Sequence, residues 1–265
     1  MSSQEKIETP ISCRYCNSHD HSSEEHSEVG SSGIQILSVS KLIPEIEIRY
    51  PFLPDKAPRY FQSGLTDVYY ARGLINDVLN HTHDEGGSLA ALKGQIVVDL
   101  GAGMGHAYFV AAMNDAKGYI AVEPSTPERV EEFLLGDKNI RDQSSDNVWS
   151  RERMKIEQDL KKSGRDFKKI PIAIVAETML SFLETLPDKS VSIIASGIDG
   201  AIIDDDYARG VDEEIIRVLH PDGLVISNSS IIGHARHNSG LQEEKSPFTF
   251  VSLAKRKTEE EPSAE

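Results

Sequence analysis

The chain of 265 residues has little cysteine, no long apolar run and a shortage of positive charge. Its two cysteines are too few to staple a fold, which excludes the disulfide-rich class of small domains. No apolar run approaches the roughly 20 residues that cross a bilayer, and the polar stretch 1–30 has no apolar block typical of a signal peptide. We therefore expect a soluble, intracellular (cytoplasmic) protein without a membrane partner.

Acidic residues outnumber basic ones by 43 to 28, so the formal net charge is −15. The resulting field repels polyanions, which disfavours nucleic acid as a partner. The segment 147–169 departs from this balance, with eight Lys and Arg against four acids. It is either a solvated helix face or a patch for an anionic substrate or partner.

Both cysteines lie in the polar N-terminal stretch, where Cys13 and Cys16 precede His19, His21 and His26. Two thiolates and two imidazoles can hold a zinc ion. The surrounding Ser, Glu and Asp residues, however, supply no apolar side chains for a zinc module to pack. The composition favours a tail without a metal, and a loss of stability on adding a chelator would favour the zinc site instead.

The distribution of apolar residues predicts one main domain with tails. The stretches 1–32 and 257–265 lack an apolar period, so we expect disordered tails there. Between them we expect an N-terminal preamble or lid over 33–95 and a ligand-binding domain over 96–256. The domain contains an insertion, 137–169, that is longer than the usual connection between strands.

Short apolar runs alternate with helical patterns along the chain. In the preamble, 46–50 predicts an edge strand and 66–79 an amphipathic helix. The later strands are predicted over Ile96–Val98, Tyr119–Val122, Ile172–Val175, Val191–Ala195, Leu224–Ser227 and Phe248–Leu253. A helix is predicted over 106–114, and a second begins near Pro127 and buries Val130, Phe133 and Leu134. A third is predicted in the insertion, where Trp149, Ile156 and Leu160 lie on one helical face. This alternation predicts an α/β fold with a doubly wound, mostly parallel sheet.

The most informative segment follows the strand that ends at Asp99. Glycines at 101, 103 and 105 allow a sharp turn and a close approach of a ligand to the backbone. A dinucleotide fingerprint, G-x-G-x-x-G, requires its third glycine where this chain has His106, which weakens the prediction of a pyrophosphate site. A P-loop is excluded because no Gly-Lys-Ser/Thr follows.

Glu123 stands at the carboxyl end of the next predicted strand, 18 residues after Gly105. A carboxylate in this place can accept hydrogen bonds from both hydroxyls of a ribose, and its charge discourages a 2′-phosphate. The glycine turn and Glu123 together therefore indicate a nucleoside ligand.

These residues resemble the class I S-adenosylmethionine-dependent methyltransferases, which have a Rossmann-like fold with an antiparallel last strand. The resemblance rests on the D-x-G-x-G-x-G form of 99–105, on Glu123, on Glu177 after the third strand, and on the turn in Ile215–Leu224. The run Phe248–Lys255 resembles the last strand of the family. Together these features cover about 95–255.

The resemblance implies S-adenosylmethionine as cofactor. The binding residues carried over are Asp99, Gly101, Ala102, Gly103, Gly105, Glu123, Glu177 and Thr178. It places the glycine turn by the methionine and ribose, Glu123 on the ribose, Glu177 and Thr178 by the adenine, and Asp99 at the amino end. The family turn "P-G-G" is Pro221-Asp222-Gly223 here, and the acid common near the start of the fourth strand is replaced by Ser192.

Methyl transfer asks mainly for alignment and exclusion of water, so a catalytic base is optional. The acceptor pocket opens beyond the fourth and fifth strands, and Asp199 is the first candidate for an orienting group or base, with a helix cap as the alternative. Further candidates are Ser196, Asn228, Ser229, Asp204, Asp205, Asp206 and Tyr207, followed by His234 and His237.

The predicted acceptor is a small molecule or a protein side chain. Ser196-Gly197-Ile198-Asp199 replaces the N/D-P-P-Y/F tetrapeptide of amino-methylating nucleic-acid enzymes, which disfavours base methylation of that type. Three alternatives stay open: an aminopropyltransferase, an NAD-dependent oxidoreductase, and a non-catalytic S-adenosylmethionine-binding module. The predicted oligomeric state stays open as well.

Overall fold

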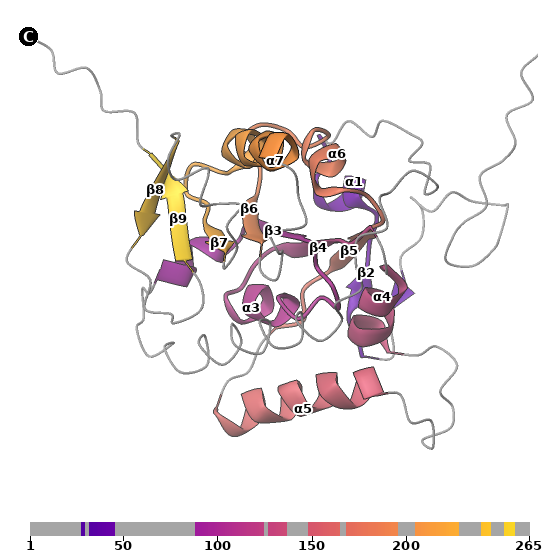
Figure 1. Cartoon of the computed structure of the whole chain (residues 1–265). Helices are drawn as coiled ribbons and strands as arrows, with labels where there is room; N and C mark the ends of the chain where they lie inside the picture. Colours follow the sequence, from indigo (N-terminus) through magenta and orange to yellow (C-terminus); the bar gives the residue numbers. More distant parts are fainter. Residues whose placement is uncertain are drawn as a thin grey trace, which may run out of the picture.

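The chain folds around a single sheet, shown in Figure 1, in a computed structural model. The structure describes residues 28–29, 32–45, 88–124, 127–136, 148–164, 168–195, 205–227, 240–244 and 252–257. Within these ranges the sheet has nine strands in the order β1-β2-β5-β4-β3-β6-β7-β9-β8. The six consecutive strands β2, β5, β4, β3, β6 and β7 are parallel to one another. Strand β1 pairs antiparallel with β2, β9 with β7, and β8 with β9.

The strands are short, as parallel strands in a doubly wound sheet are. Their bounds are β1 Glu28–Val29, β2 Gln35–Ile36, β3 Ile96–Leu100, β4 Gly118–Val122, β5 Ile172–Val175, β6 Ser192–Ala195, β7 Val225–Ser227, β8 Leu241–Glu244 and β9 Ser252–Arg256. Every residue of β3, β4, β6 and β7 is buried, which explains their mainly apolar sequences.

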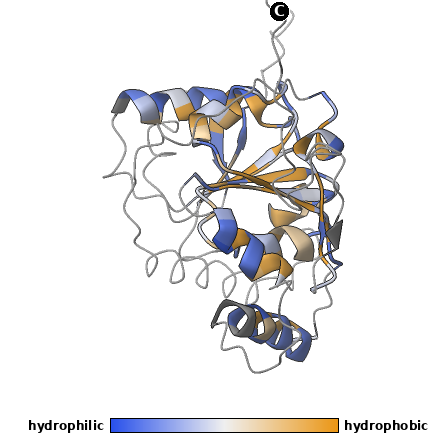
Figure 2. Cartoon of the chain, turned by 90° about the vertical axis from the view of Figure 1, so that its right-hand side faces the viewer, coloured by the Kyte–Doolittle hydropathy of each residue, from blue (hydrophilic) through white to orange (hydrophobic). Residues whose placement is uncertain are grey.

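Helices cover both faces of the sheet, as Figure 1 shows. One face carries α3 (Tyr108–Met113) and α4 (Pro127–Leu135), with α5 (Val148–Lys162) outside them. The other carries α1 (Val39–Leu42), α6 (Met179–Leu183) and α7 (Asp205–Val218). A 3₁₀ helix, Ser88–Leu92, precedes β3. Figure 2 shows mainly hydrophobic strands between helices of mixed character. In the described part of the chain no helix has the length and apolarity to span a membrane.

The structure confirms the predicted doubly wound, mostly parallel α/β sheet. The strand Ile172–Val175 has the predicted bounds, and the other central strands agree to within two residues. The helix expected over 106–114 begins only at Tyr108, because residues 101–107 form consecutive turns after β3. The last strand is antiparallel as expected, and its described part, Ser252–Arg256, ends three residues beyond the predicted Leu253; the start of the predicted run lies outside the described residues.

The elements β1, β2, α1, β8 and the 3₁₀ helix have no counterpart in the sequence predictions, and α6 and α7 were given no bounds there. Strand β2 joins the sheet through a parallel pairing of Ile36 with Ile172, and Leu42 of α1 packs on the opposite face. A side chain at Gly118 would come within 2.9 Å of Leu42 Cδ2, so β4 accepts α1 only because it begins with glycine. Residues 32–45 thus contribute to the core. The predicted strand 46–50 and helix 66–79 lie outside the described residues.

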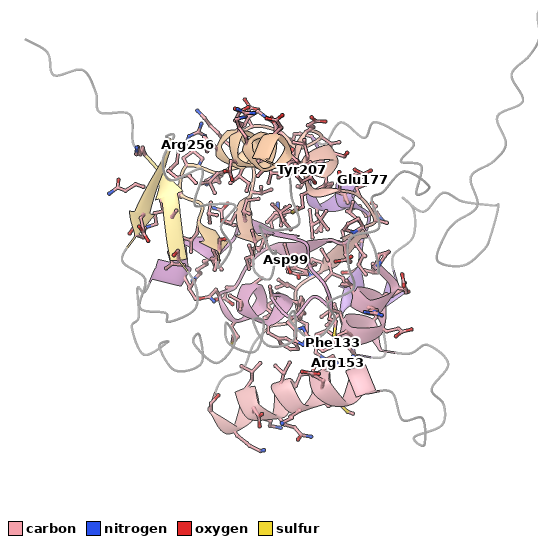
Figure 3. The ribbon with its side chains drawn as sticks, in the orientation of Figure 1. Asp99, Phe133, Arg153, Glu177, Tyr207 and Arg256 are labelled. Atoms are coloured by element: carbon pink, nitrogen blue, oxygen red, sulfur yellow. The ribbon has the colours of Figure 1, made fainter. Side chains whose placement is uncertain are left out.

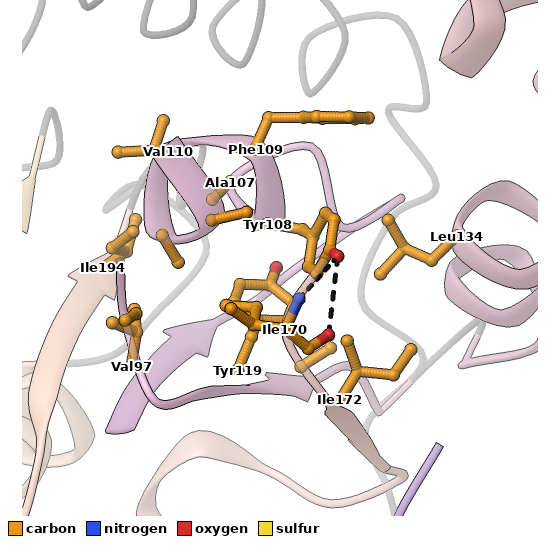
Figure 4. Close-up of a cluster of buried hydrophobic side chains, with 14 of the residues drawn as sticks. Val97, Ala107, Tyr108, Phe109, Val110, Tyr119, Leu134, Ile170, Ile172 and Ile194 are labelled. Carbon is orange, nitrogen blue, oxygen red and sulfur yellow. Dashed lines mark hydrogen bonds between the residues drawn. The ribbon is translucent and has the colours of Figure 1, made fainter. Parts of the chain in front are cut away.

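A buried tyrosine ties the sheet to the covering layer in the larger core cluster (Figure 4). The Tyr108 hydroxyl donates to the Ile170 carbonyl oxygen at 3.4 Å and accepts from the Ile170 N–H at 3.2 Å. Its ring meets Tyr119 edge-on, with centroids 5.7 Å apart. Burial raises the pKa of Tyr108 far above its ordinary value, so the phenol stays protonated.

Candidate functional site

The candidate site lies where the sheet order reverses direction. Strand β3 pairs with β4 on one side and with β6 on the other, and the chain leaves it in opposite senses to reach the two. In open α/β sheets ligands bind beyond the carboxyl ends of the strands at this switch point. The carboxyl end of β3 leads directly into Gly101, which places the glycine turn there.

The turn requires glycine for its backbone conformation. Gly101, Gly103 and Gly105 have φ values of 66°, 57° and 81°, which side-chain-bearing residues rarely adopt. The N–H groups of Gly101 and Ala102 both donate to the Val122 carbonyl oxygen, at 3.0 and 3.1 Å. The first half of the turn is therefore bonded to the end of β4.

Glu123 points at the turn, as the sequence predicted. Its Oε2 accepts a hydrogen bond from the Gly103 N–H at 3.0 Å, and the residue is 8% exposed. The Glu123 N–H donates to the Val175 carbonyl oxygen at 2.9 Å, which holds this residue beside the end of β5. A carboxylate offers about four acceptor positions, of which Gly103 takes one. The residue can thus serve the turn and a ligand hydroxyl together.

Gly105 faces α4. A Cβ at this position would lie 3.0 Å from Val130 Cγ1 and 3.1 Å from Leu134 Cδ1. Both side chains are fully buried, so they have little room to move. The third glycine is therefore explained by helix packing, and its predicted contact with a ligand stays a prediction.

Asp99 lies inside the protein at the end of β3. It is 2% exposed, and its Oδ2 accepts a hydrogen bond from the hydroxyl of Tyr119 on β4. Burial and the Asp99 charge raise the pKa of Tyr119, so the phenol remains a donor. This pairing gives Asp99 a structural role, and Figure 3 shows it at the centre of the molecule. Its predicted role at the amino end of a cofactor stays a prediction.

Glu177 and Thr178 follow β5 at the same edge of the sheet. Thr178 is the N-cap of α6, and its Oγ1 accepts from the Ser181 N–H at 3.3 Å. Glu177 is half-buried, and burial raises the pKa of its carboxyl group. The group therefore keeps its proton to a higher pH than a glutamate in water does. A carboxyl at this strand end is well placed to distinguish polar edges of a ligand. Its contact with adenine stays a prediction.

His106 is a residue of the site region that the sequence analysis treated only as a missing glycine. It follows the turn directly, is 2% exposed and stacks on Phe133 of α4, with ring centroids 4.5 Å apart. Its Nε2 lies 3.6 Å from Glu152 Oε1 of α5. A polar residue directly after the glycine turn is the signal in the sequence that could have pointed to His106. That Glu152 is its neighbour could be learned only from the structure.

The insertion 137–169 contains the predicted helix, α5, which packs on α4. Ile156 and Leu160 are buried as expected, and Arg153 is buried between them and α4. Lys155, Lys161 and Lys162 are exposed, as are Lys168 and Lys169 beyond the helix. The basic character is therefore on the solvent side, which fits a solvated face and an anionic partner equally well.

Most of the predicted acceptor-site residues lie outside the described part of the chain, including Asp199. Of that group, Asp206 and Tyr207 are described in full. Asp206 is exposed and pairs with Arg209, while the Tyr207 hydroxyl accepts from the Leu180 N–H at 3.3 Å and links α7 to α6. Figure 3 places Tyr207 and Glu177 on the same side of the sheet. The described residues contain no group of three or more His, Cys, Asp or Glu that can hold a metal ion. Cys13 and Cys16 are not among them.

No protein-family model and no curated protein matches the chain. Solved structures that the comparison matches include the ribosomal protein L11 methylase of Lactobacillus delbrueckii subsp. bulgaricus, at 15% identity and a TM-score of 0.38, over 88% of this chain and 100% of that one. The TehB-like SAM-dependent methyltransferase of Corynebacterium glutamicum is 13% identical with a TM-score of 0.38, over 73% and 99%. Arabidopsis thaliana protein arginine methyltransferase 10 is 15% identical with a TM-score of 0.37, over 63% and 38%.

The architecture of the chain itself decides its fold class. The parallel strands wind outward in both directions from β3, and the sheet ends in the antiparallel strands β9 and β8. A glycine turn and a strand-end carboxylate stand at the switch point. The chain has a doubly wound, Rossmann-like α/β fold with antiparallel strands at one edge of the sheet.

Proposed function

We propose that this protein is an S-adenosylmethionine-dependent methyltransferase that acts on a small molecule or a protein side chain. The observation that carries the proposal is the hydrogen bond from the Gly103 N–H to Glu123. It brings a glycine-rich backbone bend and a nearly buried carboxylate together at the switch point of the sheet. A nucleoside needs both features, one for close approach and one for its ribose hydroxyls.

The residues present fit the cofactor. Gly101 and Gly103 hold the turn in conformations that leave no Cβ between backbone and ligand. The Glu123 charge favours free ribose hydroxyls over a 2′-phosphate. When bound, S-adenosylmethionine supplies a methyl group already activated by its sulfonium centre.

The chain's own residues then have three tasks: to bind the nucleoside, to orient the acceptor and to exclude water. Glu123 and the turn perform the first. For the second we propose Asp199, which lies outside the described residues, as the group that orients the acceptor or takes its proton. A proton must leave only when the acceptor is an alcohol or a protonated amine, so the acceptor class decides whether this base is needed.

The test is calorimetric titration of the purified chain with S-adenosylmethionine and its demethylated product. Glu123→Ala should weaken binding by about 10- to 100-fold, because hydrogen bonds to a charged group contribute ~1.5–3 kcal/mol. Glu213→Ala removes an exposed carboxylate from α7 and serves as the charge-matched control, with unchanged affinity. Thermal melts of each variant confirm that the titrated protein is folded.

Wild-type protein that binds neither compound would overturn the proposal. Stronger stabilisation by decarboxylated S-adenosylmethionine would favour the aminopropyltransferase, and stabilisation by NADH would favour the oxidoreductase. Cofactor binding without transfer of labelled methyl to any component of a cell extract would favour the binding module. Where label appears, mass spectrometry of the labelled component identifies the acceptor atom.

A further inference from the structure

The glycine turn is held from two sides. On the inner side, Glu123 accepts the Gly103 N–H at 3.0 Å. On the outer side, the next side chain after the turn, His106, is enclosed between α4 and α5. The Phe109 N–H donates to the His106 carbonyl oxygen at 3.1 Å, so His106 also leads into α3. Any movement of the turn therefore displaces the imidazole from its enclosure.

The enclosure depends on the inserted helix. Glu152 of α5 has a side chain only 9% exposed, and its Oε1 lies 3.6 Å from His106 Nε2. Placing a carboxylate in such a position has a desolvation cost that a solvent-facing residue would avoid. Its position opposite an imidazole, whose ring rests on Phe133, is the feature that needs a reason.

The adjacent residue fixes the direction of Glu152. Arg153 Nη1 donates to the Leu134 carbonyl oxygen in the last turn of α4 at 3.2 Å, and its Nε lies 3.6 Å from Glu157 Oε1. Arg153 is 7% exposed, and burial lowers its pKa. Figure 3 shows Arg153 reaching from α5 toward Phe133. Because Arg153 anchors α5 on α4, the preceding residue is directed at His106.

The contact of His106 with α5 becomes more important when a ligand binds to Glu123 on the other side of the turn. A ribose hydroxyl that donates to Glu123 shares the carboxylate with the Gly103 N–H, so the inner hold on the turn then also positions the ligand. A second hold on the outer side then helps the turn to keep its positive-φ conformation, beside the hydrogen bonds of Gly101 and Ala102 to the Val122 carbonyl oxygen. That second hold is the contact between His106 and α5.

We propose that Glu152 and His106 form a positioning pair, through which the inserted helix α5 holds the glycine turn in its binding conformation. The proposal rests on the proposed function in naming the ligand of the turn, and it adds a residue on the insertion to the determinants of cofactor affinity. It gives the 137–169 insertion a role at the site, independent of any partner of its basic face.

The first test is the affinity of Glu152→Ala and Glu152→Gln for the demethylated cofactor product, measured by calorimetry. Loss of the pair lowers the population of the competent turn, so Glu152→Ala should bind about 5-fold or more weakly. Glu152→Gln keeps a polar partner for the imidazole and should recover part of the loss. Asp159→Asn, an exposed carboxylate on the same helix, is the matched control with unchanged affinity.

A purely structural role predicts a different result. Glu152→Ala would then lower the melting temperature and leave the affinity of the folded protein equal to wild type, which would overturn the proposal. Equal losses in Glu152→Ala and Asp159→Asn would overturn it as well, because the effect would then follow from net charge.

A second measurement separates this proposal from the proposed function. Hydrogen exchange of the amides from 103 to 107 is followed in the ligand-free protein, with the amides of β5 as the internal reference. The pair predicts faster exchange of the turn in Glu152→Ala and unchanged exchange in β5. If wild type binds no cofactor, the proposed function fails, yet faster exchange still supports the pair. Unchanged exchange of the turn would refute it.

Discussion

Replacing Gly105 by alanine should destabilise the protein through a contact that the structure defines. The new Cβ would lie 3.0 Å from Val130 Cγ1 and 3.1 Å from Leu134 Cδ1, closer than most carbon contacts in proteins. Both neighbours are side chains of α4 with no exposed surface. The helix must shift or the turn must open.

The magnitude combines three effects. A left-handed conformation costs alanine ~1–2 kcal/mol, and overpacking a filled core costs ~1–3 kcal/mol. The reduced freedom of the unfolded chain returns ~0.4–1 kcal/mol. We therefore expect Gly105→Ala to lower the free energy of unfolding by about 2–4 kcal/mol.

Gly94→Ala provides the matched control. Gly94 has φ +73° against +81° for Gly105, and nothing lies within 4 Å of its added Cβ. This variant keeps the conformational cost without the packing cost, so a loss of only about 0.5–1 kcal/mol is expected. Urea unfolding followed by circular dichroism measures both variants. Equal losses in the two would refute the packing of the turn against α4.

Two further predictions concern stability. Burial raises the pKa of Tyr108 and Tyr119 above the ordinary 10.0, so the unfolded chain loses these protons at a lower pH than the folded chain. The free energy of unfolding is therefore at its full value below about pH 10 and falls above it. Tyr108→Phe should make the fall of the urea midpoint with pH shallower, and a wild-type midpoint that stays flat to about pH 11 would contradict this. Arg217 of α7 donates to the Leu183 and Leu186 carbonyl oxygens at 2.9 and 2.8 Å. Arg217→Ala should therefore lower the free energy of unfolding by about 1–2 kcal/mol in the same assay. An unchanged free energy of unfolding would show that α7 is held to α6 without these hydrogen bonds.

The fold could be predicted from the sequence where burial is complete. Central parallel strands have continuous apolar runs, and β5 was located to the residue because all four of its residues are apolar, although only the first two are fully buried. Short edge strands lack that signal. Only Ile36 of β2 and only Leu241 of β8 are buried, so neither strand differs from loop sequence by composition.

The candidate site shows the same division. The spacing of the glycines and Glu123 was enough to predict that the carboxylate faces the turn, because neighbouring parallel strands end at one edge. The bond of Asp99 to Tyr119 was not predictable, since it joins residues two positions out of register on adjacent strands. The packing of Gly105 on α4 depends on a helix angle that no local pattern encodes.

The sequence alone determined the alternation of strands and helices, the place of the turn and the acid beside it, because these depend on burial and backbone conformation of neighbouring residues. The tertiary structure alone decided what surrounds the turn. His106 and Glu152 are 46 positions apart, and their approach within 3.6 Å depends on how α5 packs on α4. Such contacts arise from the packing of whole side-chain surfaces, which has no period along the chain.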